Sequence, residues 1–207
     1  GDVREFQLNM DGQQVTSQLG PGGQPRFSRD AIAEFQFISN RFDATQGRST
    51  GVQVNAVTRS GTNNFNGTFA GYFRNAEWGA EDPVLGVKVP LKEQQWSSTF
   101  GGPIITDKFH FFGSYEYDRS PKSTIANTAF PAFNITLEGK ESTHLTTGRL
   151  DYQLSPSNRL MLKGNLTTFN SPFTQLGSDH PAGSGSSSNQ TDSLQAALTQ
   201  VLSNRAV

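Results

Sequence analysis

The side chains whose types could do chemistry are few and scattered. Glu116 and Asp118 lie two residues apart and would share one face of a strand, where two carboxylates could act as a general acid–base pair. A wet strand surface explains the same residues without any chemistry, and we favour that interpretation. His110, His144 and His180 show no spacing typical of metal ligands, and solvated histidines explain them better.

Two loop motifs resemble catalytic sequences only in composition. The run Gly20–Gly23 (GPGG) lacks the Lys-Ser/Thr pair that binds phosphate and magnesium in a P-loop. The Ser-rich residues 184–188 contain no Gly-x-Ser-x-Gly elbow that would present a nucleophile. The sequence therefore predicts no catalytic residue, no cofactor and no metal ion, and we do not expect an enzyme. It assigns no individual ligand-binding residue.

The composition excludes several classes of protein. The 207 residues carry a net charge of -1, with 17% charged, 33% hydrophobic and 11% aromatic residues, and with 21 Gly, 16 Phe and no Cys. Without Cys there is no disulfide framework and no thiolate metal site. No apolar run approaches the roughly 18–20 residues of a membrane-spanning helix. The near-neutral charge argues against nucleic acid as a partner. Low charge and many aromatics favour an all-β fold.

From residue 65 onward, apolar and polar side chains alternate with the period of a β-strand. The clearest example sets Phe109, Phe111 and Tyr115 against Ser114 and Glu116. Within these segments every charged residue falls on the polar face, which is typical of a sheet with one apolar and one wet side. A soluble sandwich would show the same alternation. The six predicted segments are 65–74, 96–102, 109–118, 148–154, 159–167 and 194–202.

The connections between these segments distinguish a soluble sandwich from a membrane barrel. Long polar connections alternate strictly with tight turns, so that all long loops lie at one end of the sheet. Outer-membrane β-barrels show this asymmetry, and a tilted membrane-spanning strand needs about 9–11 residues. The predicted connections are 76–93, 104–107, 120–143, 155–158 and 171–190. Aromatic residues at segment ends could form interfacial girdles: Phe73, Trp96, Phe109, Tyr115, Tyr117, Tyr152 and Phe169.

Some segments remain ambiguous at this level. Residues 190–203 fit a strand, which we favour, but Leu194, Leu198, Val201 and Leu202 also have helical spacing. Six strands cannot close a lipid-facing barrel, because bacterial single-chain barrels have at least about eight. We therefore expect the chain to be a fragment of a longer protein.

The first 63 residues follow a different pattern. Residues 3–9 and 52–58 are predicted strands, and Asp11-Gly12 is a hairpin-type turn. Residues 20–25 form a Gly/Pro loop. Residues 31–38 are ambiguous between a short helix and a strand.

The motifs of both regions together resemble a known family. In order, they are the I-x-E-F strand, the A-x-x-G-R-S-x-G segment, the V-N-x-V-T-R-S-G-T-N run, the F-x-G strand ending in R-N, and a G-G-P-I hairpin continuing into F-F-G-S-Y-E. They occupy residues 32–35, 44–51, 54–63, 65–75, 101–108 and 111–116. This series is similar to TonB-dependent outer-membrane transporters, above all to the Oar-like group. The chain departs from the family at Gly51-Val52, where Gly-Gly is common.

The resemblance implies a fold and a place in the cell. It implies an all-β protein in which residues 1–63 are the C-terminal part of a plug domain. Residues 64–207 would be the first six strands of a transmembrane antiparallel β-barrel of about 22 strands. Charged side chains on the polar face would point at the plug or at lumen water, namely Arg74, Glu116, Arg149, Asp151 and Lys163. The expected location is the outer membrane of a Gram-negative bacterium, in contact with its lipid.

The resemblance also implies a function. We expect energised uptake of an unidentified ligand, such as a peptide or saccharide, driven by an inner-membrane TonB complex. That complex would engage a segment that precedes these residues. Ligand contacts would come from loops 76–93, 120–143 and 171–190 and from residues 20–29. The alternatives are a structural or adhesive outer-membrane barrel without active transport, and a soluble all-β sugar-binding module.

Overall fold

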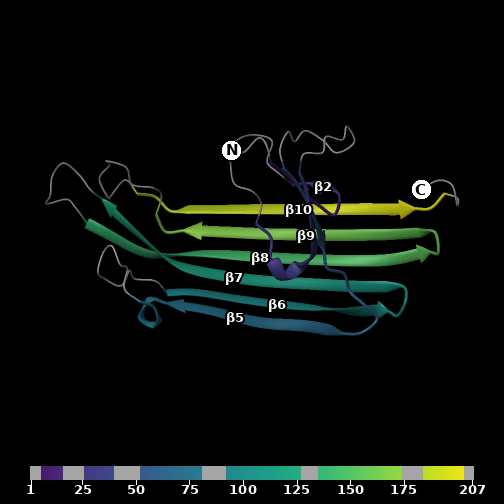
Figure 1. The fold of residues 1–207 in the computed structure, drawn as a ribbon, viewed down its shortest axis with the longest axis horizontal. Helices are drawn as coiled ribbons and strands as arrows, with labels where there is room; N and C mark the ends of the chain where they lie inside the picture. Colours follow the sequence, from purple (N-terminus) through teal and green to yellow (C-terminus); the bar gives the residue numbers. More distant parts are fainter. Residues whose placement is uncertain are drawn as a thin grey trace.

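A computed structural model describes residues 6–15, 26–39, 52–80, 92–126, 135–173 and 184–202. Within these ranges the chain forms a six-stranded and a four-stranded sheet (Figure 1). Predictions made for Gly20–Gly23, the motif at residues 44–51 and His180 fall outside the described residues.

The larger sheet is an antiparallel meander in which every strand pairs with its neighbours in the sequence. The spatial order is β10-β9-β8-β7-β6-β5, and the registers of all five pairs are antiparallel. This topology confirms the all-β, antiparallel prediction. The strands are β5 (Asn66–Asn75), β6 (Lys92–Ile105), β7 (Phe109–Ala126), β8 (Ile135–Ser155), β9 (Asn158–Ser171) and β10 (Ser187–Gln200).

Residues 187–200 form the strand β10, which decides the ambiguity over this segment in favour of a strand. Its register runs without a shift from the Ser187–Ser171 pair to the Gln200–Asn158 pair. Leu194 and Leu198 therefore share one face, and both are exposed. The adjacent Gln195 lies on the opposite face, which is the alternation that lipid on one side and polar surface on the other would select.

The two faces of the sheet differ as the alternation predicts. On one face, large apolar side chains are exposed, with Phe69 at 74% and Leu194 at 81%. On the other face, Ser97, Ser114 and Thr147 are buried beneath other residues. We call these the outer and the inner face. The inner face is not purely polar, since Phe112, Leu145 and Met161 are buried on it.

Two strands are much longer than the sequence pattern indicated. β7 has 18 residues and β8 has 21, and they remain paired from Phe109–Tyr152 as far as Ala126–Ile135. The prediction that residues 120–143 form a long loop was therefore wrong: the connection is only 127–134. The added part of the hairpin is polar, so a search for apolar alternation could not find it. A strand extending beyond the membrane has no apolar face to reveal it.

Long and short connections alternate as predicted. The tight turns are at residues 106–108 and 156–157, and the longer connections are 76–91, 127–134 and 172–186. Figure 1 shows both tight turns at the right end of the sheet. Asp107 adopts a positive φ of 61° in the first turn, a conformation that Asp tolerates better than most residues. A short 3-10 helix, η3 (Ala76–Trp78), follows β5.

The smaller sheet has the order β2-β1-β4-β3. Its strands are β1 (Phe6–Met10), β2 (Gln13–Gln14), β3 (Ile32–Ser39) and β4 (Val52–Thr58). β1 and β4 are parallel, while the other pairs are antiparallel. The ambiguous residues 31–38 are thus mainly strand, preceded by the 3-10 helix η2 (Arg29–Ala31). Asp11 and Gly12 form the predicted turn, with φ values of 48° and 81°.

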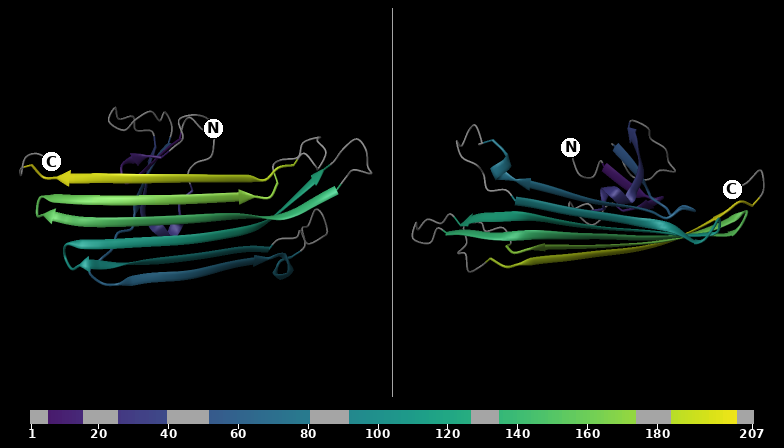
Figure 2. Two further views of the ribbon diagram at one scale, coloured as in Figure 1. Left: turned by 180° about the vertical axis from the view of Figure 1, so that it is seen from behind. Right: turned by 90° about the horizontal axis from the view of Figure 1, so that it is seen from below.

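The smaller sheet lies on one face of the larger one. Figure 1 shows its strands running steeply across the long strands, and the right view of Figure 2 shows it on one side only. The side chains that contact it, described below, all come from the inner face. The outer face carries no described element.

No helix among the described residues has the length and apolar character needed to cross a membrane.

Candidate functional site

The candidate site is the polar interface between the smaller sheet and the inner face of the larger one. Its centre is Asp11, in the turn between β1 and β2. The Asp11 carboxylate accepts hydrogen bonds from the Thr58 backbone N–H at 2.9 Å and from the Thr58 hydroxyl at 2.8 Å. Both bonds join the β1–β2 turn to β4. They hold the carboxylate in place at the tip of the hairpin, facing the larger sheet.

Asp11 reaches two cations of the larger sheet. Lys163 on β9 donates to its carboxylate at 2.6 Å, and Arg149 on β8 approaches it at 3.5 Å. The side chain of Lys163 is 1% exposed and that of Asp11 is 6% exposed. Gln195 on β10 also donates to the Asp11 backbone carbonyl at 3.0 Å. One turn of the smaller sheet thus contacts three adjacent strands of the larger one.

Arg149 extends this contact to β4 and to its own strand. Its guanidinium donates at 2.9 Å to both the carbonyl and the hydroxyl oxygen of Thr58. It also forms a two-pronged ion pair with Asp151, at 2.8 and 3.0 Å. Arg159 on β9 binds the same Asp151 carboxylate at 2.9 Å. Arg149 is therefore held in one orientation by planar, bidentate pairing and is presented to the smaller sheet.

The surroundings of Asp11 favour its ionised form. Burial raises the pKa of this carboxyl, but the hydrogen bonds from Lys163 and Thr58 and the charge of Lys163 outweigh burial. The net result is a pKa below the ordinary value. The carboxylate is consequently charged at neutral pH and pairs with Lys163 as an ion pair.

A second contact involves η2. Asp30 accepts a hydrogen bond from the Ser97 hydroxyl on β6 at 2.5 Å. Arg29 lies 3.5 Å from Gln95 on the same strand. Gln95 in turn donates to Glu116 on β7 at 2.6 Å. Side chains immediately before β3 therefore bind the inner face at a point well separated in sequence from Asp11.

A third contact comes from Arg26. Its guanidinium donates to the Thr143 hydroxyl at 3.2 Å, and its backbone carbonyl accepts from the Thr167 hydroxyl at 3.3 Å. The guanidinium also lies over the ring of Phe169, 5.5 Å from the ring centroid. This arrangement is a cation–π contact.

The segment between the two sheets is held at the end of the tight turns. The Asn63 carboxamide oxygen accepts from the Asp107 backbone N–H at 2.8 Å and lies 2.7 Å from His110 Nε2. The Asn63 amide nitrogen donates to the Asp107 carboxylate. These contacts fix the point at which the chain leaves the smaller sheet and enters β5.

The arrangement can hold two sheets together, and it offers little to catalysis. Glu116 and Asp118 share the inner face, as predicted, and Glu116 is occupied by Gln95. His144 points to the outer face, where the Tyr115 hydroxyl lies 2.8 Å from its Nδ1. Among the described residues, no three His, Cys, Asp or Glu side chains gather in a way that could hold a metal ion.

The charged residues predicted to point at the plug or at lumen water all lie on the inner face. Arg149 and Lys163 contact the smaller sheet, and Asp151 binds Arg149. Arg74 has a side chain that is 72% exposed and pairs with Glu93 at 3.8 Å, while Glu116 accepts a hydrogen bond from Gln95. The central role of Asp11 was missed. A turn Asp followed by Gly has an obvious local explanation, and nothing in the pattern indicates that the carboxylate faces two cations about 140–150 residues away.

The sheet, its faces and its alternating connections define an outer-membrane β-barrel. A comparison with known families supports the assignment: residues 57–136 match a family described as "Outer membrane beta barrel domain". The strands β5–β10 are part of such a barrel, and the protein resides in the outer membrane of a Gram-negative bacterium.

The chain is also similar to a particular curated protein, the TonB-dependent transporter Oar of Myxococcus xanthus. The two are 32% identical over 96 residues, which cover 42% of this chain and 9% of that protein. The chain thus spans less than a tenth of the length of this relative. The match confirms the resemblance to Oar-like TonB-dependent outer-membrane proteins. No solved structure matches the chain significantly.

Proposed function

We propose that the protein is a TonB-dependent outer-membrane receptor that takes up an unidentified ligand through a plugged β-barrel. In this proposal residues 1–63 are the C-terminal part of the plug and residues 64–207 are the first barrel strands. The inner-membrane TonB complex would act through a segment that precedes these residues. The ligand, a peptide or a saccharide, would contact the loops at the long-loop end. The role is transport and not catalysis.

The observation that carries this proposal is the chemistry of the interface. The smaller sheet contacts the inner face through ion pairs and hydrogen bonds centred on Asp11, Asp30 and Arg26. When the two surfaces separate, water replaces polar contacts of this kind, so the net free-energy cost of separation is modest. Separating an apolar interface would instead expose apolar surface to water, which is unfavourable. Such an interface suits a plug that shifts when it is pulled and returns afterwards.

A labelling experiment tests the proposal without knowledge of the ligand. The chain has no Cys, so an introduced Cys is unique within it. Ala31 is 1% exposed and belongs to η2, which contacts β6 and β7. In the complete protein, an Ala31→Cys variant should react slowly with a membrane-impermeant maleimide in de-energised cells. It should react several-fold faster in energised cells that contain TonB.

Thr62→Cys is the matched control, because Thr62 is exposed in the structure and should react at the same rate in both states. A rate at Ala31→Cys that does not respond to energisation, in cells with an intact TonB system and across culture media rich in peptides and saccharides, would contradict active transport. It would favour the structural or adhesive barrel instead.

A further inference from the structure

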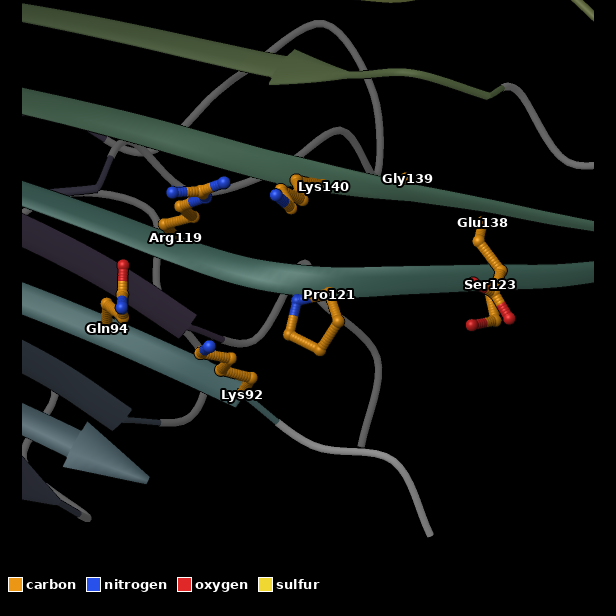
Figure 3. A pocket seen from close by; sticks show the side chains of 8 residues that line it. All are labelled: Lys92, Gln94, Arg119, Pro121, Ser123, Glu138, Gly139 and Lys140. Atoms are coloured by element: carbon orange, nitrogen blue, oxygen red, sulfur yellow. The ribbon is translucent and has the colours of Figure 1, made fainter. Parts of the chain in front are cut away.

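Three cations lie on the outer face of the barrel strands, beyond the end of the apolar band. Lys92 on β6, Arg119 on β7 and Lys140 on β8 line one hollow together with Pro121 and Gln94. Figure 3 shows the three cationic side chains around Pro121. Lys92 and Lys140 are exposed and Arg119 is half-buried. None of the three forms an ion pair or hydrogen bond with another described side chain.

The strand registers place these cations relative to the aromatic residues. Trp96, Tyr117 and His144 are paired across β6, β7 and β8. The rings of Tyr117 and His144 are 4.8 Å apart. Arg119 follows Tyr117 on the same outer face by two residues. A ring row at the end of an apolar band marks the interface between the hydrocarbon and the lipid headgroups.

Lys92 and Lys140 lie farther from the aromatic row than Arg119 does. Each is four residues beyond the aromatic row on its own strand, or about 13 Å along the strand, and Lys140 is paired with Pro121. This is the long-loop end of the sheet, which faces the outside of the cell in outer-membrane barrels. The cations therefore lie at the depth of the outer leaflet's headgroups.

These three side chains point away from the barrel interior, so they do not line the proposed transport path. They project from the outer face, while the plug contacts of Asp11 and Asp30 are on the inner face. Two inner-face cations at the same end are paired: Lys122 with Glu141 at 2.8 Å and Arg74 with Glu93 at 3.8 Å. A cation cluster that faces the membrane, and to which the described residues offer no ion-pair partner, is complementary to anionic lipid. Arg in particular matches the geometry of phosphate oxygens.

We propose that Lys92, Arg119 and Lys140 form a binding site for the phosphate groups of lipopolysaccharide, the phosphorylated glycolipid of the outer leaflet. Arg119, nearest the aromatic row, would bind a phosphate next to the acyl chains. Lys92 and Lys140 would bind phosphates farther from the hydrocarbon. Glu138, the acidic residue that lines the same hollow, is paired with Ser123 two residues beyond Lys140. Figure 3 shows it apart from the three cations.

The test uses the complete barrel protein, purified in detergent and depleted of lipid. Its affinity for purified lipopolysaccharide is compared with that of the triple variant Lys92→Gln/Arg119→Gln/Lys140→Gln. The expected result is an affinity at least tenfold lower in the triple variant. The matched control Arg74→Gln/Lys122→Gln removes two inner-face cations at the same end of the sheet and should bind as the parent does.

Two arms on the unmodified protein keep the test independent of how the variants fold. Enzymatically dephosphorylated lipopolysaccharide should bind at least tenfold more weakly than the intact lipid. Inorganic phosphate at millimolar concentration should not displace the intact lipid. Equal binding by the parent and a folded triple variant would overturn the proposal. So would equal binding of the intact and dephosphorylated lipids, or displacement by inorganic phosphate, which would indicate a site for the free ion.

Discussion

At the residue scale, Asp11 decides how the smaller sheet is attached. Its backbone has a positive φ of 48°, a conformation that Asp and Asn adopt more readily than other side-chain-bearing residues. The same residue offers a carboxylate to Lys163, which is buried beneath it. Position 11 therefore needs a residue that tolerates a positive φ and also carries a negative charge.

Replacing Asp11 by Asn should loosen the smaller sheet while leaving the turn intact. Asn keeps the backbone conformation, but Lys163 is left as a buried charge without a counterion, which costs about 3–5 kcal/mol. The backbone amides of β4 should then exchange hydrogen about a hundredfold faster or more. Hydrogen–deuterium exchange of the complete protein in detergent micelles measures this effect.

Two further variants test whether the charge pair is responsible. Asp11→Asn combined with Lys163→Met removes both charges and should cost less than the sum of the single changes. Glu93→Gln breaks the exposed pair with Arg74 and should have almost no effect, because exposed ion pairs contribute little. Strictly additive effects at Asp11 and Lys163 would show that the two residues act independently.

The lowered pKa of Asp11 makes the attachment sensitive to acid. A carboxyl whose pKa is lower in the folded state stabilises that state fully above its unfolded value, 3.8, and loses this effect as the pH falls through the lowered pKa. The smaller sheet should stay attached from neutral pH down to about pH 4 and loosen below it.

The distance between spin labels at Glu34→Cys and Gln200→Cys, one on each sheet, reports this change. Asp11→Asn should show a smaller change over the same acidic range. An identical acid response in the two proteins would show that Asp11 does not cause the loosening.

At the scale of elements, the sequence pattern predicted the membrane part of each strand and missed the rest. Lipid on one side enforces an apolar alternation, which is visible in residues such as Phe109, Phe111 and Leu194. No such demand acts on the outer ends of β7 and β8, where backbone pairing alone extends the hairpin. The contacts between sheets were equally hidden, because the partners of Asp11 and Asp30 are set by the three-dimensional packing and not by spacing in the chain.

The two faces of β5 should respond oppositely to a charge. Phe69 lies on the outer face, 5.8 Å from the Trp96 ring, and Ala70 lies on the inner face opposite Ser97. In the complete barrel, Phe69→Arg should destabilise by about 1–2 kcal/mol, because Phe69 lies two residues from the level of Trp96 and the cost of a cation on the lipid face falls from the bilayer midplane toward the interface. Ala70→Arg should cost much less, because its side chain reaches water.

Urea unfolding of the two variants in lipid vesicles gives this comparison directly. Equal losses of stability at the two positions would mean that β5 does not separate lipid from an aqueous interior.

At the scale of the whole molecule, one sheet serves two environments. Its outer face meets lipid, and its inner face receives the smaller sheet through polar contacts. Both features follow from strand geometry, because successive side chains point to opposite faces of the sheet. The proposed uptake needs both, since the barrel must stay in the membrane while the plug is released.

A nitroxide scan along β8 tests this division most directly. Single Cys variants of the complete protein in lipid vesicles, from residue 143 to residue 152, are labelled and their access to oxygen and to a water-soluble nickel complex is measured. The account predicts that even-numbered positions such as His144 and Leu150 favour oxygen, which concentrates in lipid. Odd-numbered positions such as Thr147 should be shielded from oxygen. Uniform access along the strand, or the opposite alternation, would contradict it.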